Sequence, residues 1–302
     1  LTIPEAVAKG MSIYLMMAIG FKGGAGVAAH GLDTTLLLAL LAGIVLSALI
    51  PLVAFVLLTR TSALPRVDAA AVVAHYGSIS IVTFLAATEA LRSSGIPAES
   101  YMVAVAAAME TPAIFVGLLL AQAGQKNTGD PADGGGLDKT ALREVALNGS
   151  IVVLVGAFII GWITGPEGLK SIEPFVVSPF KGVLCLFLLD MGLIAGRGLR
   201  DGGKNLSPSV IAFGIYMPLI GASMGLAAGM LVGLSTGGVA LLVTLSASAS
   251  YIAVPAAMRL ALPEARPAIY LPLSLGVTFP FNLVIGIPIY IAAATAFTGA
   301  TP

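Results

Sequence analysis

Charge is what this sequence most lacks. Charged residues occupy 10% of its 302 positions and hydrophobic residues 58%, and the mean hydropathy is +1.01. Because a soluble domain carries about a quarter charged residues, this composition excludes a soluble protein and indicates an integral membrane protein. The net charge is zero, so the composition gives no argument for binding nucleic acid.

Cysteine and histidine are nearly absent as well. The single cysteine, Cys185, excludes an internal disulfide, and two histidines, His30 and His75, make a histidine-rich metal centre improbable on composition. Neither histidine stands in a pattern with Cys185 or with a pair of carboxylates. A membrane enzyme, which would need a nucleophile or a metal set, is therefore disfavoured.

Long apolar runs are what the sequence has. A helix needs about 20 mainly apolar residues to cross a bilayer, and nine runs qualify: 3–22, 35–59, 68–91, 99–122, 145–164, 175–196, 207–233, 237–262 and 268–298. The last run is predicted to be broken, because Pro272, Pro280 and Pro288 interrupt it. The polar segment 122–143 reads as an exposed linker within a single transmembrane domain, 1–302.

Short motifs recur in order along the chain. The matched pairs are Ser78 with Ser248 and Ser80 with Ser250 at a spacing of 170, Thr111-Pro112 with Phe279-Pro280 at 168, and Lys9-Gly10 with Lys181-Gly182 at 172. Chance similarity of Ala-, Leu- and Gly-rich segments is the alternative, but ordered matches favour a duplicated unit, 1–121 and 144–302. The second unit has one span more. We therefore expect a plan of two five-helix repeats, ten helices in all, of which nine lie in this chain and the first precedes it.

Positive charge predicts the orientation. With the linker 122–143 in the cytoplasm, eleven Lys and Arg residues fall on the cytoplasmic side and four, Lys22, Arg92, Lys170 and Lys181, on the other. This bias predicts a multi-pass protein of the plasma (inner) membrane. An odd number of spans per repeat inverts the second copy, and inverted repeats are typical of transporters with a site at mid-membrane.

Glu110 is the most informative single residue. It lies near the middle of the span 99–122, where an acid costs about 2.5–3.5 kcal/mol and normally faces a cavity or a partner. Pro112 can open the helix beside it and free carbonyls, which suits a hard cation. We predict a sodium ligand or a proton carrier; the alternative is a structural acid bonded to a neighbouring helix.

The serine stretches at 77–83 and 244–251 are predicted to be two halves of one binding site. Residues two apart on a helix point to different sides, so Ser78 and Ser80 can share a site only where the helix unwinds, which Gly77 permits. Close helix packing through small residues is the alternative. Asp190 is a weaker candidate, and His75 with Tyr76 reads as a packing pair.

The chemistry of these residues suggests cation–anion symport. No Lys or Arg lies at mid-span, so an anion would be held by helix N-termini, backbone N–H groups and hydroxyls. One acid with hydroxyls suits sodium. The predicted anion site comprises Gly77, Ser78, Ser80, Thr83, Ser248, Ser250 and Asn282, and the predicted sodium site Glu110, Ser80, Thr111 and Thr278. A channel and a sodium- or proton-coupled carrier of a small organic anion are the alternatives.

Several motifs resemble the sodium-dependent bicarbonate permease family of cyanobacteria and other bacteria. They are Leu1-Thr2-Ile3-Pro4-Glu5-Ala6, Gly20-Phe21-Lys22-Gly23-Gly24, His75-Tyr76-Gly77-Ser78-Ile79-Ser80, Tyr101-Met102-Val103-Ala104, Met109-Glu110-Thr111-Pro112-Ala113-Ile114 and Ser248-Ala249-Ser250-Tyr251-Ile252-Ala253-Val254-Pro255-Ala256-Ala257. They occur in order and cover the whole chain.

The resemblance implies more than the residues do by themselves. It implies an elevator-like carrier with a core part and a gate part, sodium as the coupling ion and bicarbonate as the substrate. It also implies a homotrimer, with contacts mainly from the spans within 1–24 and 145–196. In some members of the family a PII-like regulatory protein docks on the cytoplasmic side.

Overall fold

The computed structural model describes residues 3–31, 33–123, 149–202 and 206–299, and all regular structure in these ranges is helical. Apart from Gln122 and Ala123, the predicted linker 122–143 lies outside the described residues, as does the start of the predicted span 145–164.

The helices follow the predicted apolar runs. They are α1 (Glu5–His30), α2 (Thr34–Thr61), α3 (Arg66–Gly77), α4 (Ile81–Ser93), α5 (Met102–Met109), α6 (Pro112–Gln122), α8 (Gly149–Ser171), α9 (Glu173–Val176), α10 (Phe180–Gly202), α11 (Pro208–Val232), α12 (Thr236–Ala247), α13 (Ala253–Ala261), α14 (Pro267–Leu271), the π-helix η3 (Pro272–Thr278), α15 (Phe279–Phe281), the π-helix η4 (Asn282–Gly286) and α16 (Ile287–Thr298).

Fewer helices meet the length and composition of a membrane span than the nine predicted. Among the described residues six helices meet them, and a seventh is added if Val155–Ser171 and Glu173–Asp190, which are bent by 94°, count as one span. The run 237–262 falls short because a break divides it into two short helices, α12 and α13. The protein is therefore a multi-pass helical membrane protein.

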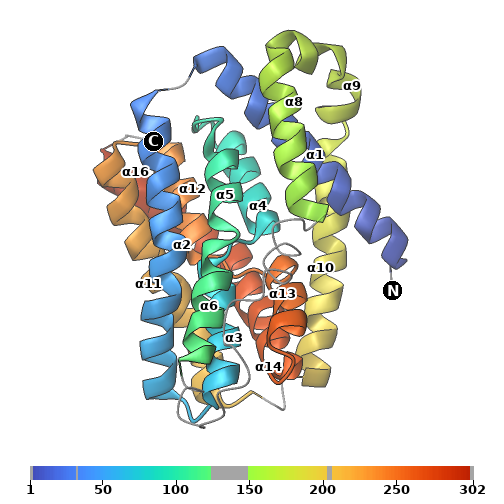
Figure 1. Ribbon diagram of the computed structural model, residues 1–302. Helices are drawn as coiled ribbons and strands as arrows, with labels where there is room; N and C mark the ends of the chain where they lie inside the picture. Colours follow the sequence, from blue (N-terminus) through green and yellow to red (C-terminus); the bar gives the residue numbers. More distant parts are fainter. Residues whose placement is uncertain (1–2, 32, 124–148, 203–205, 300–302) are drawn as a thin grey trace, which may run out of the picture.

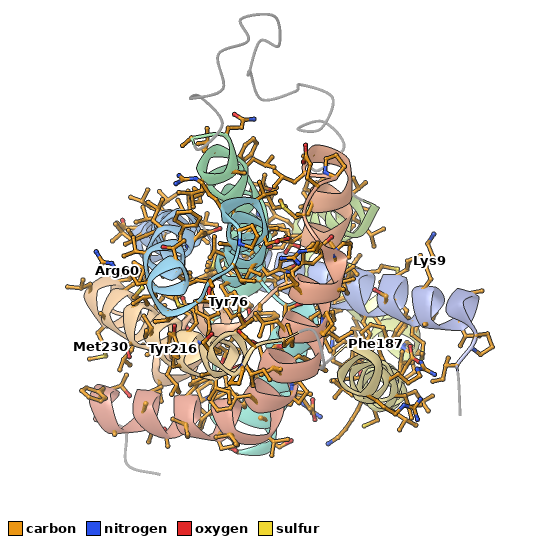
Figure 2. All side chains as sticks on the ribbon, turned by 90° about the horizontal axis from the view of Figure 1, so that it is seen from below. Lys9, Arg60, Tyr76, Phe187, Tyr216 and Met230 are labelled. Carbon is orange, nitrogen blue, oxygen red and sulfur yellow. The ribbon has the colours of Figure 1, made fainter. Side chains whose placement is uncertain are left out.

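The helices form two groups (Figure 1). The long, tilted α1 crosses α8, and α1, α8, α9 and α10 lie together on one side of the remaining helices. We call these four helices the flank and the others the bundle. Figure 2 shows Tyr76 inside the bundle, whereas Arg60 and Lys9 project from the periphery of the bundle and the flank.

Glycines bring α1 and α8 into backbone contact. A Cβ on Gly24 would lie 1.9 Å from the carbonyl oxygen of Phe158, and a Cβ on Gly161 would lie 2.2 Å from that of Phe21. Only glycine permits two helices to approach this closely. The sequence Gly23-Gly24-Ala25-Gly26 by itself predicts a loop after a helix. That prediction is wrong, because these glycines serve helix packing and α1 continues to His30.

Replacing Gly24 by Ala should separate α1 from α8 and lower the thermal stability of the purified protein by several degrees, because the added methyl group meets backbone that cannot turn away. Gly10, on the same helix, is the matched control, since a Cβ there meets nothing within 4 Å. Melting curves in detergent would show the difference. Equal melting temperatures for Gly24→Ala and Gly10→Ala would contradict the packing argument.

The last span is continuous rather than broken. Residues Pro267–Thr298 form one helix of 32 residues. The prolines at 272 and 280 fall within or beside π-helical turns, whose wider hydrogen-bond spacing accommodates the missing N–H groups. The prediction of a break there is wrong for this physical reason.

Candidate functional site

Two real breaks lie opposite each other in the bundle. The helix α3 ends at Gly77 and α4 begins at Ile81, while α12 ends at Ala247 and α13 begins at Ala253. The Ser80 N–H donates to Ser248 Oγ at 2.9 Å, and the Ser250 N–H donates to the His75 carbonyl at 2.8 Å. The two serine stretches are therefore joined by hydrogen bonds. Residues Ser78, Ser80 and Ser248 have extended backbone, as the sharing of a site requires.

A small cavity opens beside these breaks. Its volume is about 30 Å³, room for one or two water-sized groups. Its polar lining comes from Ser80, Ser250, Glu110 and Tyr251, and its apolar lining from Met16, Ile79, Ile81, Ala107, Ile252 and Ala253. Residues from both breaks and from the α5–α6 junction thus meet in one place.

Two helix N-termini face the cavity. Ile81 and Ala253, the first residues of α4 and α13, both line it. The first N–H groups of a helix have no partner within the helix, and the helix dipole makes this end favourable for an anion. The α13 N-terminus has no side-chain cap, which leaves the N–H groups of Ala253 and Val254 for a ligand, while Pro255 in the same turn has no N–H.

The Ser80 hydroxyl is oriented for donation. It caps α4 by accepting the Thr83 N–H at 3.2 Å, and it also accepts the Thr83 hydroxyl at 2.9 Å. With two bonds accepted, its own proton is left for a ligand in the cavity. Ser248 differs, because its hydroxyl donates to the Leu245 carbonyl and accepts from Ser80. Ser80 faces the site, and Ser248 holds Ser80 in place.

Glu110 lies at the junction of α5 and α6. Its side chain is partly exposed to the cavity, and among the described residues no cation or hydrogen-bond donor reaches its carboxylate. The alternative of a structural acid bonded to a neighbouring helix is thus without support in this part of the chain. The backbone at Glu110 and Thr111 stays helical, so α5 and α6 form one span across Pro112.

Ser47 on α2 holds this junction together. Its hydroxyl donates to the Met109 carbonyl at 2.6 Å and accepts the Ala113 N–H at 3.2 Å. The residue is fully buried. Nothing in the sequence marked it, since a lone serine in an apolar run reads as a packing residue.

Replacing Ser47 by Ala should leave the Ala113 N–H and the Met109 carbonyl without this partner, at a cost of about 1–3 kcal/mol. We expect lower thermal stability, because the Glu110 junction loses its support. Ser47→Thr, which keeps the hydroxyl, tests for rescue. Normal stability in Ser47→Ala would contradict the role.

The remaining predicted residues lie outside the cavity. The Asn282 amide donates to the Ala247 carbonyl and accepts from Tyr290, and the Thr278 hydroxyl donates to the Gly214 carbonyl and contacts Tyr76 Oη at 2.7 Å. Gly77 lies so close to Pro51 and Ser47 that a Cβ would clash with both. Thr111 adjoins Glu110 without lining the cavity.

Some buried polar atoms at or near the two helix breaks lack a hydrogen-bond partner within the described residues. They are His75 Nε2, Ser78 Oγ, Ser246 Oγ and Tyr251 Oη. The Tyr251 hydroxyl lies close to Ser80 without completing a regular hydrogen bond. Tyr251 is the last residue of the serine stretch 244–251, so its position could have indicated it. His75 stacks on Tyr270 and its Nδ1 contacts the Ser250 carbonyl, in keeping with a packing role.

These features define a multi-pass membrane protein whose polar cavity is built from interrupted helices. The chain belongs to the Na+-dependent bicarbonate transporter superfamily, whose family model matches residues 1–295. No curated protein matches the sequence significantly. At the level of the family the protein is thus a sodium-dependent bicarbonate transporter.

Proposed function

We propose that the protein is a symporter that imports bicarbonate, or a similarly small oxyanion, together with sodium. The observation that carries this proposal is the single cavity that combines an unpaired carboxylate, two serine hydroxyls and two helix N-termini. The hydroxyls and the N–H groups suit the anion. The carboxylate suits sodium, which takes oxygen ligands as other hard cations do.

The residues divide between the two ions according to their placement. Ser80 and Ser250 hold the anion, with the N–H groups of α4 and α13. Glu110 holds sodium, with Ser80 between the two ions and Thr111 beside it. The other predicted residues position these groups: Gly77, Ser78, Thr83, Ser248, Asn282 and Thr278. The bonds of Thr83, Ser248, Asn282 and Thr278 are made within the protein.

Two contacts, each made by a carboxylate, support the inverted repeats. Asp68, near the start of α3, accepts three hydrogen bonds from the N–H and guanidinium of Arg266, at 2.6–2.9 Å. Glu99 accepts the N–H and hydroxyl of Ser235 at the start of α12, at 2.7 and 2.8 Å. Asp68 and Ser235 are 167 residues apart, as are Glu99 and Arg266. The same contact is thus made twice, with the acid on opposite partners.

We assign the bundle to the moving core and the flank to the gate of an elevator-like carrier in the inner membrane. In this arrangement the linker 122–143 faces the cytoplasm, where a PII-like regulator would dock, and the flank helices make the contacts of a homotrimer. A stable monomer by mass measurement in detergent at all concentrations would overturn the trimer.

The test is uptake of radiolabelled bicarbonate by the purified protein in liposomes. An inward sodium gradient should drive uptake above that of protein-free liposomes, which measure leakage through carbon dioxide, and potassium should not replace sodium. No sodium-dependent uptake would overturn the proposal. Organic anions are the second candidate, and the cavity of about 30 Å³ disfavours those larger than bicarbonate, so an excess of lactate or succinate should compete poorly.

A further inference from the structure

A second, larger pocket lies between the flank and the bundle. Its volume is about 350 Å³, and its lining comes mainly from α1, α4, α10 and the residues around the start of α5. Lys22, Arg92 and Lys181 line it together with Glu89 and Glu99. Three cations against two carboxylates give the pocket one net positive charge, whereas the cavity at Glu110 has no Lys or Arg in its lining.

Both carboxylates of this pocket already have partners. Glu89 contacts Arg92 at 2.9 Å and Lys181 at 3.0 Å, and Glu99 is bound to Ser235. The Lys22 ammonium instead lies 3.8 Å from the centre of the Phe180 ring. Among the described residues, no carboxylate oxygen lies within 4.0 Å of the Lys22 ammonium, the distance limit for a salt bridge.

Lys22 is therefore the cation left over for a ligand. It lies within the span Ala6–Ala29, where a charged residue without an acidic partner points to function. The Phe180 ring stabilises the ammonium from one side. Arg92 and Lys181, whose side chains are 68% and 62% exposed, form a positive rim that raises the local concentration of anions.

Lining residues shared by neighbouring spaces run from the pocket to the cavity at Glu110 along one face of α5. Val103 lines both the pocket and a neighbouring apolar space of about 180 Å³, and Ala107 lines both that space and the cavity at Glu110. Val103, Ala107 and Glu110 are spaced four and three residues apart, so they share a helix face. Shared lining thus leads from Lys22 to Glu110.

We propose that this pocket is a second oxyanion site, at which Lys22 holds a small monovalent anion before it reaches the cavity at Glu110. The identity of the anion as bicarbonate rests on the proposed function. The existence of the site rests on the pocket alone.

The first experiment measures the charge of the pocket without transport. Thr88 lines the pocket, and Thr88→Cys in a Cys185→Ser background gives one thiol there. A negatively charged sulfonate thiol reagent should modify it faster than a trimethylammonium reagent of similar size, and bicarbonate should slow the modification. Lys22→Gln should lower the ratio of the two rates at least about threefold and remove the protection.

Two variants serve as controls. Lys170→Gln removes an exposed lysine that does not line the pocket and should leave the rate ratio and the protection unchanged. Lys22→Arg keeps the charge and should retain both, which keeps the test decisive if Lys22→Gln does not fold. Three results would overturn the site. The ratio of the two modification rates could be equal in Lys22→Gln and Lys170→Gln, it could fall in Lys22→Arg, or bicarbonate could fail to protect the Thr88→Cys protein.

Uptake assays separate this inference from the proposed function. Lys22→Gln should raise the bicarbonate concentration for half-maximal uptake about 3- to 10-fold, with little change in the maximal rate, because the cavity at Glu110 is intact. An unchanged value would overturn the entry role while sodium-driven uptake stands. Protection of Thr88→Cys without any sodium-driven uptake in wild type would instead overturn the proposed function and leave the anion site in place.

Discussion

Glu110→Gln should strongly weaken the sodium dependence of bicarbonate uptake. The carboxylate lines the cavity without a protein cation, so in the proposed mechanism sodium supplies the compensating charge. Ions that share a cavity attract strongly in a low effective dielectric, and a coupling of 1–3 kcal/mol corresponds to about 5- to 150-fold in affinity. The neutral amide loses that attraction. We expect the sodium concentration for half-maximal uptake to rise at least about tenfold.

Stability measurements distinguish this role from a structural one. Glutamine has nearly the shape of glutamate and removes an unpaired charge from an apolar setting, so Glu110→Gln should fold at least as stably as wild type. Sodium should raise the melting temperature of wild type through binding to the folded state and should have no such effect on Glu110→Gln. The matched control is Glu264→Gln, at an exposed glutamate in a loop.

Other results would contradict this assignment. Wild-type sodium dependence in Glu110→Gln would exclude Glu110 as a sodium ligand. Uptake by wild type that follows a proton gradient in the absence of sodium would identify Glu110 as a proton carrier instead.

The sequence predicted the two helix breaks better than the partners of the polar residues around them. Ser78, Ser80 and Ser248 stand out because small hydroxyl residues in the middle of an apolar run usually serve a site or a close helix contact. Their recurrence at one spacing places them on matched elements. The extended backbone at these serines follows from that local chemistry. Glu110 stands out for the same reason, through the cost of an acid in a span.

The placement of Asn282 and Thr278 could not be predicted in the same way. Their sequence position matches that of Glu110, but their partners, Ala247, Tyr290, Gly214 and Tyr76, come from other elements. Such long-range hydrogen bonds depend on how helices pack, and hydropathy carries no information on packing. The same limit applies to the glycines of α1. Their sequence predicts a loop, and only the contact with α8 shows that they serve helix packing.

The number of spans shows a second limit. Hydropathy measures the length of apolar runs, whereas a membrane span in space also depends on where the backbone bends. The run 237–262 is long and apolar, yet the break at the serines leaves α12 with 12 residues. The prolines of the last span gave the opposite error. They predicted a break, but π-helical turns keep this span continuous.

Ser80→Ala and Ser250→Ala should weaken bicarbonate binding strongly, each by about 10- to 100-fold, because a hydrogen bond to a charged group contributes about 1.5–3 kcal/mol. The loss should appear in the bicarbonate concentration for half-maximal uptake, and sodium dependence should persist at saturating bicarbonate. Ser80→Ala should have the larger effect, since it also removes the cap that accepts from Thr83 at the start of α4.

Two further serines make the comparison specific. Ser248→Ala removes the acceptor of the Ser80 N–H but no group that lines the cavity, so it should lower stability and the rate of uptake more than the affinity for bicarbonate. Ser223→Ala, at an exposed serine of α11 that bonds only within its own helix, should have no effect. If Ser80→Ala and Ser250→Ala keep wild-type affinity, or if Ser248→Ala reproduces their loss of affinity without a loss of stability, the two cavity serines do not hold the anion.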